Sequence, residues 1–254
     1  MRKVLVAVLL FLLTLGFRNG YCAKFQEQWK DISYGIDEID LKTIAVGPNN
    51  PDIIYAGSAK SIFKSQDGGK TWQKLYLIRG TLTAVNAICI DPKNQDCVYA
   101  GTQNGLYKTS DAGLTWNRLF EGTGAQEKEI RHMVIETENT EQIYLGTANG
   151  IFITSDGGRI WNKSTGEISN RMITFIAINP IDPNIVYAAA QTGIFKSKDH
   201  GLTWDSIFIT GNQSEITEIE EIAEEINNDE PAISSDRIPN CIVIDNQDIN
   251  KIYI

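Results

Sequence analysis

Histidine and cysteine are scarce in this sequence, which has two histidines and four cysteines among 254 residues. These residues do not cluster at the short spacings that transition-metal sites use, so a zinc or similar site has no basis in the sequence. The turn DPKNQD at residues 91–96 lacks the spacing of an EF-hand calcium loop. We therefore expect no metal site and no cofactor.

Basic residues are also few. The chain has 23 lysines and arginines against 32 aspartates and glutamates, a formal net charge of −9, and the basic residues form no run. Proteins that bind nucleic acids or anionic membrane surfaces carry positive patches, because these patches attract and neutralise phosphate charge. We therefore expect no nucleic-acid partner and no anionic membrane surface as a partner.

The longest apolar run is too short to span a bilayer, since Val4–Phe17 has 14 residues and a transmembrane helix needs about 20. Two basic residues precede this run and a short polar segment follows it, which is the pattern of a signal peptide. We assign residues 1–23 to a signal peptide, with cleavage after Cys22 favoured over cleavage after Ala23. The mature chain is expected to be secreted or periplasmic, with a charge of −12 (20 basic and 32 acidic residues) and no integral membrane segment.

One octapeptide occurs four times along the chain. It reads SQDGGKTW at Ser65–Trp72, and the other copies are TSDAGLTW at Thr109–Trp116, TSDGGRIW at Thr154–Trp161 and SKDHGLTW at Ser197–Trp204. The aspartates of successive copies are 44, 45 and 43 residues apart. A second pattern precedes each octapeptide at the same spacing, as in ICIDPKNQDCVYAG from Ile88. Two markers in one register indicate an array of one supersecondary unit.

Each repeat is predicted to contain four short strands. In the second repeat, apolar runs at Ala87–Ile90 and Cys97–Ala100 flank a polar turn, a third run at Gly105–Thr109 leads into the octapeptide, and a fourth begins at Trp116. Short strands separated by regular turns are typical of all-β proteins. Four strands in a period of about 40–45 residues indicate a β-propeller blade. We predict an all-β fold, a β-propeller of four-stranded antiparallel blades, with four full blades and a partial fifth.

The octapeptide suits a hairpin turn between the third and fourth strands. Its aspartate can accept hydrogen bonds from nearby backbone N–H groups. The glycine two residues after this aspartate can adopt a positive φ, and the tryptophan can fill the wedge between blades. The third copy differs because Ile160 replaces the threonine. The turn chemistry predicts structural roles for the repeated residues: Asp67, Gly69, Trp72, Asp111, Gly113, Trp116, Asp156, Gly158, Trp161, Asp199, Gly201 and Trp204.

The pattern S/T-x-D-x-G-x-T-W resembles the Asp-box, or bacterial neuraminidase repeat. This motif occurs in sialidases, sortilin-type propellers, xyloglucanases and photosystem II assembly factors. The resemblance covers about residues 25–254 and implies one propeller domain over residues 24–254. It also implies that the Asp-boxes lie on the face opposite any substrate site, so that Asp67 and its equivalents are structural and neither catalytic nor metal-binding.

The two ends of the chain also contain parts of the repeat. Residues Glu27–Ile32 match the start of the fourth strand in other repeats, and we predict that they form the outermost strand of the last blade. Residues 241–254 are a fifth copy of the first strand, its turn and the opening of the second strand. Four blades and a partial fifth do not close a ring of the usual size, and an open arc would expose strand edges. We therefore expect a truncated ring.

The connection between Trp204 and Ile242 is about 22 residues longer than its counterparts. Its centre, Ser214–Glu230, has isoleucines at helical spacing and glutamates on the other face, which predicts a short acidic helix. We assign this insertion to about residues 208–236. It either docks its apolar stripe on the propeller, which is the favoured interpretation, or contacts a partner.

Cys89 and Cys97 flank the turn between the first two strands of the second blade. Antiparallel pairing would bring them within reach of a disulfide, and an oxidising compartment would permit the bond. The alternative, slightly favoured, is that they are two small apolar residues, because other repeats have alanine and isoleucine at these places.

Arginines gather ahead of the first strands, on the face opposite the Asp-boxes. Arginine can bind carboxylates in a bidentate manner. The candidate binding residues are therefore Arg79, Arg131, Arg171 and Arg237. The alternative is that these arginines pair with acidic residues of the chain itself.

The sequence offers no evident catalytic set. A sialidase-like site would need an arginine ahead of the first Asp-box, and there is none between residues 19 and 78. A xyloglucanase-like site would need two aspartates facing a cleft. We expect an exported, non-enzymatic propeller that binds an unidentified protein or glycan. The alternative is a fragment of a sialidase- or xyloglucanase-like glycoside hydrolase whose catalytic residues are missing or lie beyond the C-terminus.

Overall fold

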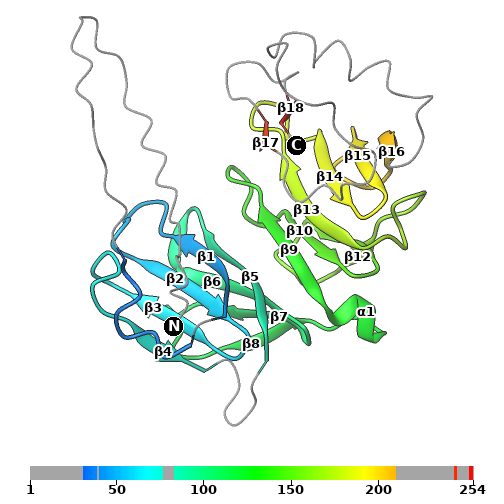
Figure 1. The fold of residues 1–254 in the computed structure, drawn as a ribbon. Helices are drawn as coiled ribbons and strands as arrows, with labels where there is room; N and C mark the ends of the chain where they lie inside the picture. The colour runs from blue at the N-terminus through cyan, green and yellow to red at the C-terminus, as the bar shows by residue number, and fades with distance from the viewer. Residues whose placement is uncertain (1–30, 39, 77–82, 210–242, 245–251, 254) are drawn as a thin grey trace, which may run out of the picture.

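Four antiparallel sheets, each made of four consecutive strands, follow the four sequence repeats (Figure 1). The structure is a computed structural model and describes residues 31–38, 40–76, 83–209, 243–244 and 252–253. The predicted all-β architecture of four-stranded blades is confirmed. We number the blades one to four in chain order.

The strands have the following bounds. Blade one contains β1 (Leu41–Val46), β2 (Ile54–Ser58), β3 (Ile62–Ser65) and β4 (Gln73–Leu75). Blade two contains β5 (Val85–Asp91), β6 (Asn94–Thr102), β7 (Gly105–Thr109) and β8 (Asn117–Phe120). Blade three contains β9 (Ile130–Ile135), β10 (Ile143–Thr147), β11 (Gly150–Thr154) and β12 (Asn162–Lys163). Blade four contains β13 (Ile173–Ile178), β14 (Val186–Ala190), β15 (Gly193–Ser197) and β16 (Asp205–Ile209).

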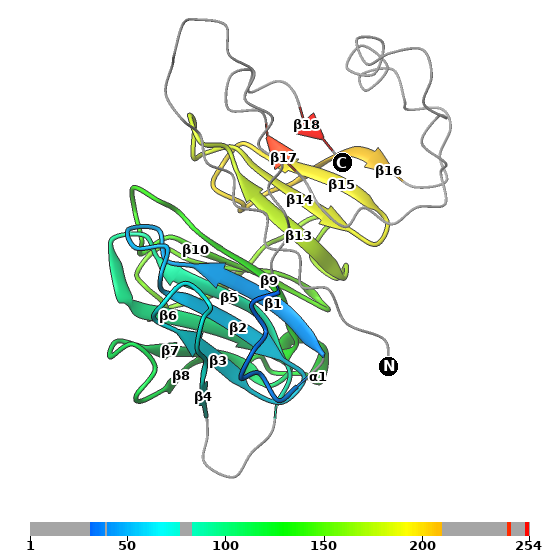
Figure 2. The same ribbon diagram turned by 60° about the vertical axis from the view of Figure 1, so that its left-hand side comes forward.

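The first strands of the blades lie side by side along the inside of an arc. β1 contacts β5, β5 contacts β9, and β9 contacts β13, so each blade meets the next through its first strand (Figures 1 and 2). The short helix α1 (Ala125–Lys128) in the connection from blade two to blade three was not predicted. The blades thus present their first strands toward a common axis.

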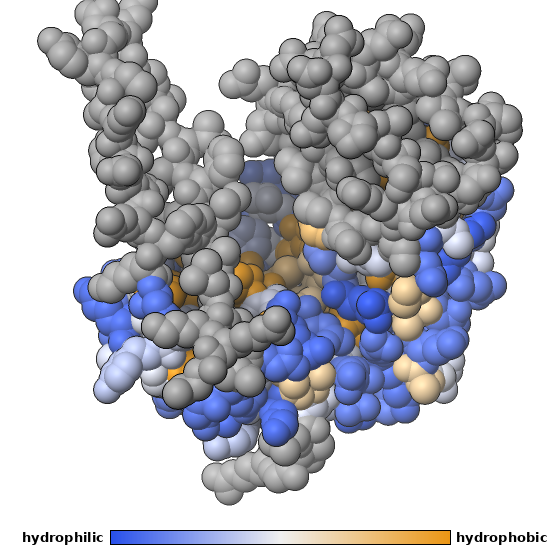
Figure 3. All heavy atoms as spheres, viewed as in Figure 1, coloured by the Kyte–Doolittle hydropathy of each residue, from blue (hydrophilic) through white to orange (hydrophobic). Residues whose placement is uncertain are grey.

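Apolar side chains fill the space between successive blades. One buried cluster joins blades one and two, a second joins blades two and three, and a third joins blades three and four. Each second strand contributes an almost fully buried tyrosine at the same place: Tyr55, Tyr99, Tyr144 and Tyr187. Figure 3 shows a mainly hydrophilic outer surface, with apolar residues visible chiefly in the recess near the centre of the view. Packing between sheets therefore holds the arc together.

The Asp-box turns share one hydrogen-bond network. In the first turn, the Ser65 hydroxyl donates to Asp67 Oδ1 at 2.8 Å and accepts from the N–H of Gly69 at 2.8 Å. The N–H and the hydroxyl of Thr71 both donate to the Asp67 carboxylate, at 2.8 and 2.6 Å. Gly69 has φ +85°, and the side chain of Ile32 lies directly over it, so a residue with a Cβ would be both strained and crowded there.

The third Asp-box turn lacks one hydroxyl donor. Asp156 accepts the N–H groups of Arg159 and Ile160, each at 2.9 Å, but Ile160 has no hydroxyl to add. Hydrogen bonds, from Thr71 in the first turn and from Thr109 and Thr115 in the second, lower the pKa of Asp67 and Asp111 to about 2. In the third turn the N–H of Ile160 is the main group that lowers the pKa of Asp156.

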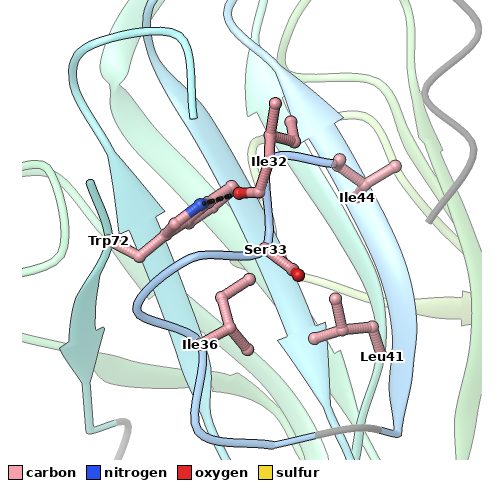
Figure 4. Close-up of a pocket in the computed structure, with 7 residues that line it drawn as sticks. Ile32, Ser33, Ile36, Leu41, Ile44 and Trp72 are labelled. Carbon is pink, nitrogen blue, oxygen red and sulfur yellow. Dashed lines mark hydrogen bonds between the residues drawn. The ribbon is translucent and has the colours of Figure 1, made fainter. Parts of the chain in front are cut away.

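Three of the four Asp-box tryptophans lie at the inter-blade clusters. Trp116 packs against the cluster of blades one and two, Trp161 against that of blades two and three, and Trp204 belongs to that of blades three and four. Trp72 lies on the face of blade one that none of the described blades covers, and its indole N–H donates to the carbonyl of Ile32 at 2.7 Å (Figure 4). Trp116, Trp161 and Trp204 thus lie at the expected wedge position, whereas Trp72 has no described blade beside it.

Ile32 supports part of the interpretation of the N-terminal segment. Its side chain lies over Gly69 as Leu75 lies over Gly113 and as Leu119 lies over Gly158. Leu75 and Leu119 come from the outer region of the preceding blade, so Ile32 holds the place of a residue from a blade before blade one. The structure shows no strand at Asp31–Glu38, and the rest of the predicted strand, residues 27–30, lies outside the described residues.

The last hairpin follows the register of a blade. β17 (Val243–Ile244) pairs with β18 (Ile252–Tyr253), with Ile244 opposite Ile252. In blade two the same register places Ile90 opposite Val98. This agrees with a fifth copy of the first hairpin. The predicted helical insertion falls on residues outside those described, apart from residues 208–209, which belong to β16.

Candidate functional site

Each innermost strand carries a β-bulge at the same position. In every blade one residue of the first strand has no partner on the second strand, and this residue is polar. The four bulge residues are Lys42, Asn86, Arg131 and Thr174. A bulge breaks the alternation of side chains and redirects one of them, and bulges are common beside functional sites. Four blades thus contribute one redirected polar side chain each.

The four bulge side chains, with Gln103 and Glu129, line a hollow of about 380 Å³ that we call the axial hollow. Gln103 lies in the loop between β6 and β7, and Glu129 directly precedes β9. Both positions belong to the connections opposite the Asp-box turns. The hollow therefore opens where the first strands of the blades meet, on the face that the sequence predicted for binding.

The axial hollow contains two cationic side chains and one carboxylate. Arg131 Nη1 donates to Glu129 Oε1 at 2.7 Å, and each of these side chains is about one third exposed (35% and 33%). Arg131 Nε is buried and has no hydrogen-bond partner among the described residues. Lys42 is exposed and pairs with no carboxylate of the described part of the chain. The lining thus has one positive charge in excess on a chain that is negative as a whole.

Two of the three neutral lining residues, Asn86 and Thr174, are held by hydrogen bonds to the backbone. Asn86 Nδ2 donates to the carbonyl of Ile130 at 3.0 Å, which joins the innermost strands of blades two and three and leaves Asn86 Oδ1 as an acceptor. The Thr174 hydroxyl donates to the carbonyl of Ala189 at 3.2 Å. The hollow can therefore offer both donors and acceptors to a polar ligand.

Arg171, one of the predicted binding arginines, does not line the axial hollow. Its Nε donates to the carbonyl of Glu167 at 2.7 Å, its Nη1 contacts the hydroxyl of Thr192, and its guanidinium lies 5.3 Å from the ring centre of Phe195. In the other three blades a strand-four lysine or arginine lies over the equivalent ring, whereas blade four has Ser206 there. Arg171 fills this place in blade four and lies outside the axial hollow.

The other predicted arginines have different outcomes. Arg131 lines the hollow, but it also pairs with Glu129, as the alternative interpretation proposed. Arg79 and Arg237 lie outside the described residues. Among the predicted arginines that the structure describes, Arg131 lines the hollow and Arg171 does not, and Lys42 joins Arg131 there.

Cys89 and Cys97 are free thiols in the structure, so the disulfide considered above is not formed. The register explains this, because Cys89 lies opposite Tyr99 and not opposite Cys97. The Cys89 thiol lies 3.3 Å from the carbonyl of Met133, and burial raises its pKa to about 12. Such a thiol is inert at neutral pH.

In the described part of the chain, no group of three or more histidine, cysteine, aspartate or glutamate side chains is placed to hold a metal ion. Over the same residues, no helix has the length and apolar character needed to cross a bilayer.

No protein-family model matches the chain, and no curated protein matches it in sequence. Solved structures do match. An ancestral GH74 enzyme has a TM-score of 0.58 at 20% identity, over 66% of this chain and 24% of the enzyme. The fold is that of Asp-box-type β-propellers.

Two other propeller structures have similar scores. The extracellular domain of a protein described as a hybrid two-component system from B. thetaiotaomicron has a TM-score of 0.57 at 14% identity, over 70% of this chain and 23% of that one. The GH74 xyloglucanase from Xanthomonas campestris has a TM-score of 0.53 at 14% identity, over 89% of this chain and 45% of the enzyme. This chain therefore spans less than half the length of each of these propeller proteins. At these identities the similarity establishes the fold and no activity.

Sequence reasoning missed Lys42, Asn86, Gln103, Glu129 and Thr174. A signal for three of them was available, because aligning the first strands of the propeller blades gives LKTI, VNAI, IRHM and ITFI. The second letter is polar in every copy although the strand is otherwise largely apolar. A polar residue repeated at one position of an inner strand indicates a side chain that faces the axis. Gln103 and Glu129 lie in connections of variable sequence and have no comparable signal.

Proposed function

We propose that this chain is an exported, non-enzymatic binding module that holds a protein or glycan partner at the axial hollow. The observation that supports this most directly is the set of four bulges, each of which brings one polar side chain to the same hollow. A fold needs no bulge to keep an inner strand apolar, so four equivalent bulges with polar residues favour a binding role.

The lining of the hollow favours binding over glycoside hydrolysis. Hydrolysis of a glycosidic bond commonly uses two carboxyl groups that flank the bond. Of the six lining residues only Glu129 carries a carboxylate, and this carboxylate pairs with Arg131. A carboxylate paired with an arginine is suited to holding that arginine in place, whereas a general acid or a nucleophile must itself reach the substrate. The proposal of a propeller without catalytic activity rests on this arrangement.

The proposal is tested by capture on the intact protein. Surface-immobilised wild-type protein and the double variant Lys42→Gln/Arg131→Gln are exposed to a glycan library and to secreted proteins of the source organism. We expect a partner that the wild type retains and the double variant loses, while both proteins unfold at the same temperature. Lys60→Gln serves as the control, because Lys60 is exposed and lies in the β2–β3 loop, outside the hollow. Equal capture by the double variant would place binding elsewhere.

The absence of catalysis is tested separately. Purified protein is incubated with xyloglucan and with a fluorogenic sialoside, and we expect no product above a buffer blank. Turnover that disappears when one acidic residue is replaced by its amide would establish the hydrolase alternative instead. Export is tested by mass spectrometry of the protein recovered outside the cytoplasm, for which cleavage after Cys22 predicts a mature chain that begins at Ala23.

A further inference from the structure

We infer that the axial hollow binds a single uronic-acid residue of a glycan. This inference rests on the proposed binding function and adds the chemical class of the ligand. The hollow has one positive charge in excess, from Lys42 and Arg131 against Glu129. One carboxylate neutralises this excess, whereas a dianionic phosphate or sulfate cluster would place a second negative charge beside Glu129. The charge balance therefore selects a monoanion.

The remaining lining residues suit the hydroxyl groups of a sugar ring. Asn86, Gln103 and Thr174 are neutral and carry amide or hydroxyl groups. A volume of about 380 Å³ lies in the range of small-ligand sites. The lining contains no aromatic or aliphatic side chain, although protein interfaces depend on apolar or aromatic anchors that enter complementary pockets. An entirely polar hollow of this size is thus better matched to a hydroxyl-rich carboxylate than to a peptide.

Glu129 is the residue that sets specificity in this site. Its Oε1 accepts a hydrogen bond from Arg131 Nη1 at 2.7 Å. A ligand carboxylate would therefore bind the other donors of Arg131 and the ammonium group of Lys42. The charge of Glu129 also disfavours ligands with more than one negative group near the hollow. The whole chain carries a net charge of −9, which repels polyanions at long range. An isolated uronate on an otherwise neutral glycan is therefore favoured over a polyuronate.

The first experiment compares two sugars that differ only at C6, where one has a carboxylate and the other a neutral hydroxymethyl group. Isothermal titration calorimetry measures binding of methyl β-glucuronide and methyl β-glucoside to the full chain at low salt. We expect the glucuronide to bind at least about tenfold more tightly than the glucoside. Arg131→Gln and Lys42→Gln should each remove this preference, whereas the control Lys60→Gln should keep it. Thermal unfolding of every variant verifies that the fold is retained.

The second experiment uses Glu129→Gln to test the specificity role. Removing this charge frees Arg131 and raises the positive excess from one to two, so glucuronide should bind more tightly and inorganic sulfate should become a competitor. A merely structural role for Glu129 would lower the unfolding temperature and weaken all ligands alike. If Glu129→Gln leaves both affinities unchanged, the residue does not set specificity and this part of the inference is wrong.

The outcomes separate this inference from the proposed function. Equal binding of glucoside and glucuronide would show that the carboxylate is not recognised. Capture of an acidic peptide that depends on Lys42 and Arg131, without glucuronide binding, would overturn the uronate inference and leave the binding function intact. A partner whose capture is unaffected by both substitutions would contradict the proposed function as well.

Discussion

One hydroxyl group separates the third Asp-box turn from the other three. The Asp67, Asp111 and Asp199 carboxylates each accept a threonine hydroxyl, at 2.6, 2.5 and 2.5 Å. Ile160 stands at this place in the third turn, where its side chain is 64% exposed and gains little from burial. The turn keeps its shape because the backbone N–H groups of residues 159 and 160 still reach Asp156. A lost side-chain donor is thus offset by the backbone.

We predict that Ile160→Thr stabilises the protein. The new hydroxyl can donate to Asp156 as Thr71 donates to Asp67, and an exposed isoleucine is removed at little cost. The thermal midpoint should rise by about 1–3 °C, measured by differential scanning calorimetry. The matched control Thr115→Ile imposes the third turn's sequence on the second and should lower the midpoint. If the midpoint falls for Ile160→Thr, or changes in the same direction for both variants, the third turn has a different geometry from the second.

Because burial shifts the pKa of His132, we predict that the stability of the protein depends on pH below about 6.5. Burial lowers its pKa from 6.5 to about 4, and its Nδ1 accepts the N–H of Ile176 in the next blade at 3.2 Å. The unfolded chain binds the proton more readily, so the stabilising contribution is complete above pH 6.5 and is lost as the pH falls to about 4. The loss should amount to about 2–4 kcal/mol in urea titrations at pH 7 and pH 4. The carboxyls of Asp67 and Asp111 contribute a separate loss between pH 3.8 and about 2.

The variant His132→Asn isolates this histidine. Asparagine keeps an acceptor for the N–H of Ile176 but does not titrate, so stability should become nearly flat between pH 6.5 and 4. His200→Asn is the control, because His200 is exposed and its φ of 56° is one that asparagine tolerates. If both variants keep the wild-type slope, another group titrates in this window.

At the scale of elements, the blades could be predicted because their turn chemistry is local. The Asp-box network involves residues within one octapeptide, so a recurring D-x-G-x-T-W fixes the hairpin in each repeat. The bulges could not be located in the same way. A bulge depends on the pairing of two strands, and the polar letter at Asn86 alone does not show whether its side chain points to the axis or to a neighbouring blade. The pairing of Arg131 with Glu129 likewise needs coordinates.

The close approach of neighbouring blades gives a prediction for glycine in β6. A Cβ at Gly101 would lie 2.5 Å from Cγ2 of Ile130 in the next blade. Gly101→Ala should therefore destabilise the protein by about 1–3 kcal/mol in urea unfolding, because the blades must move apart. Gly124→Ala is the control, since a Cβ there meets no atom within 4 Å. A loss below about 0.5 kcal/mol at Gly101 would show that the packing between the two blades relaxes easily.

At the scale of the whole molecule, the position of a blade in the arc determines how much an equivalent isoleucine is buried and how much it contributes to the free energy of unfolding. Ile44, Ile88 and Ile176 lie opposite alanines at the same position of their inner strands. Their exposed fractions are 36%, 6% and 1%, because a preceding blade covers the last two and none of the described blades covers the first. Beside Ile44, the side chains of Ile32, Ile36, Leu41 and Trp72 form an apolar surface on blade one (Figure 4).

Because these isoleucines differ in burial, we predict that replacing each of them by alanine lowers the free energy of unfolding by different amounts. Ile88→Ala and Ile176→Ala remove fully packed side chains and should each cost about 2–5 kcal/mol. Ile44→Ala removes a side chain that is still partly in water, and it should cost no more than about half as much, since the transfer free energy scales with the area buried. Urea unfolding with an unchanged m-value measures all three. If Ile44→Ala proves as costly as the other two, blade one is covered in solution by a further blade, and its apolar surface is an inter-blade contact like the three already seen.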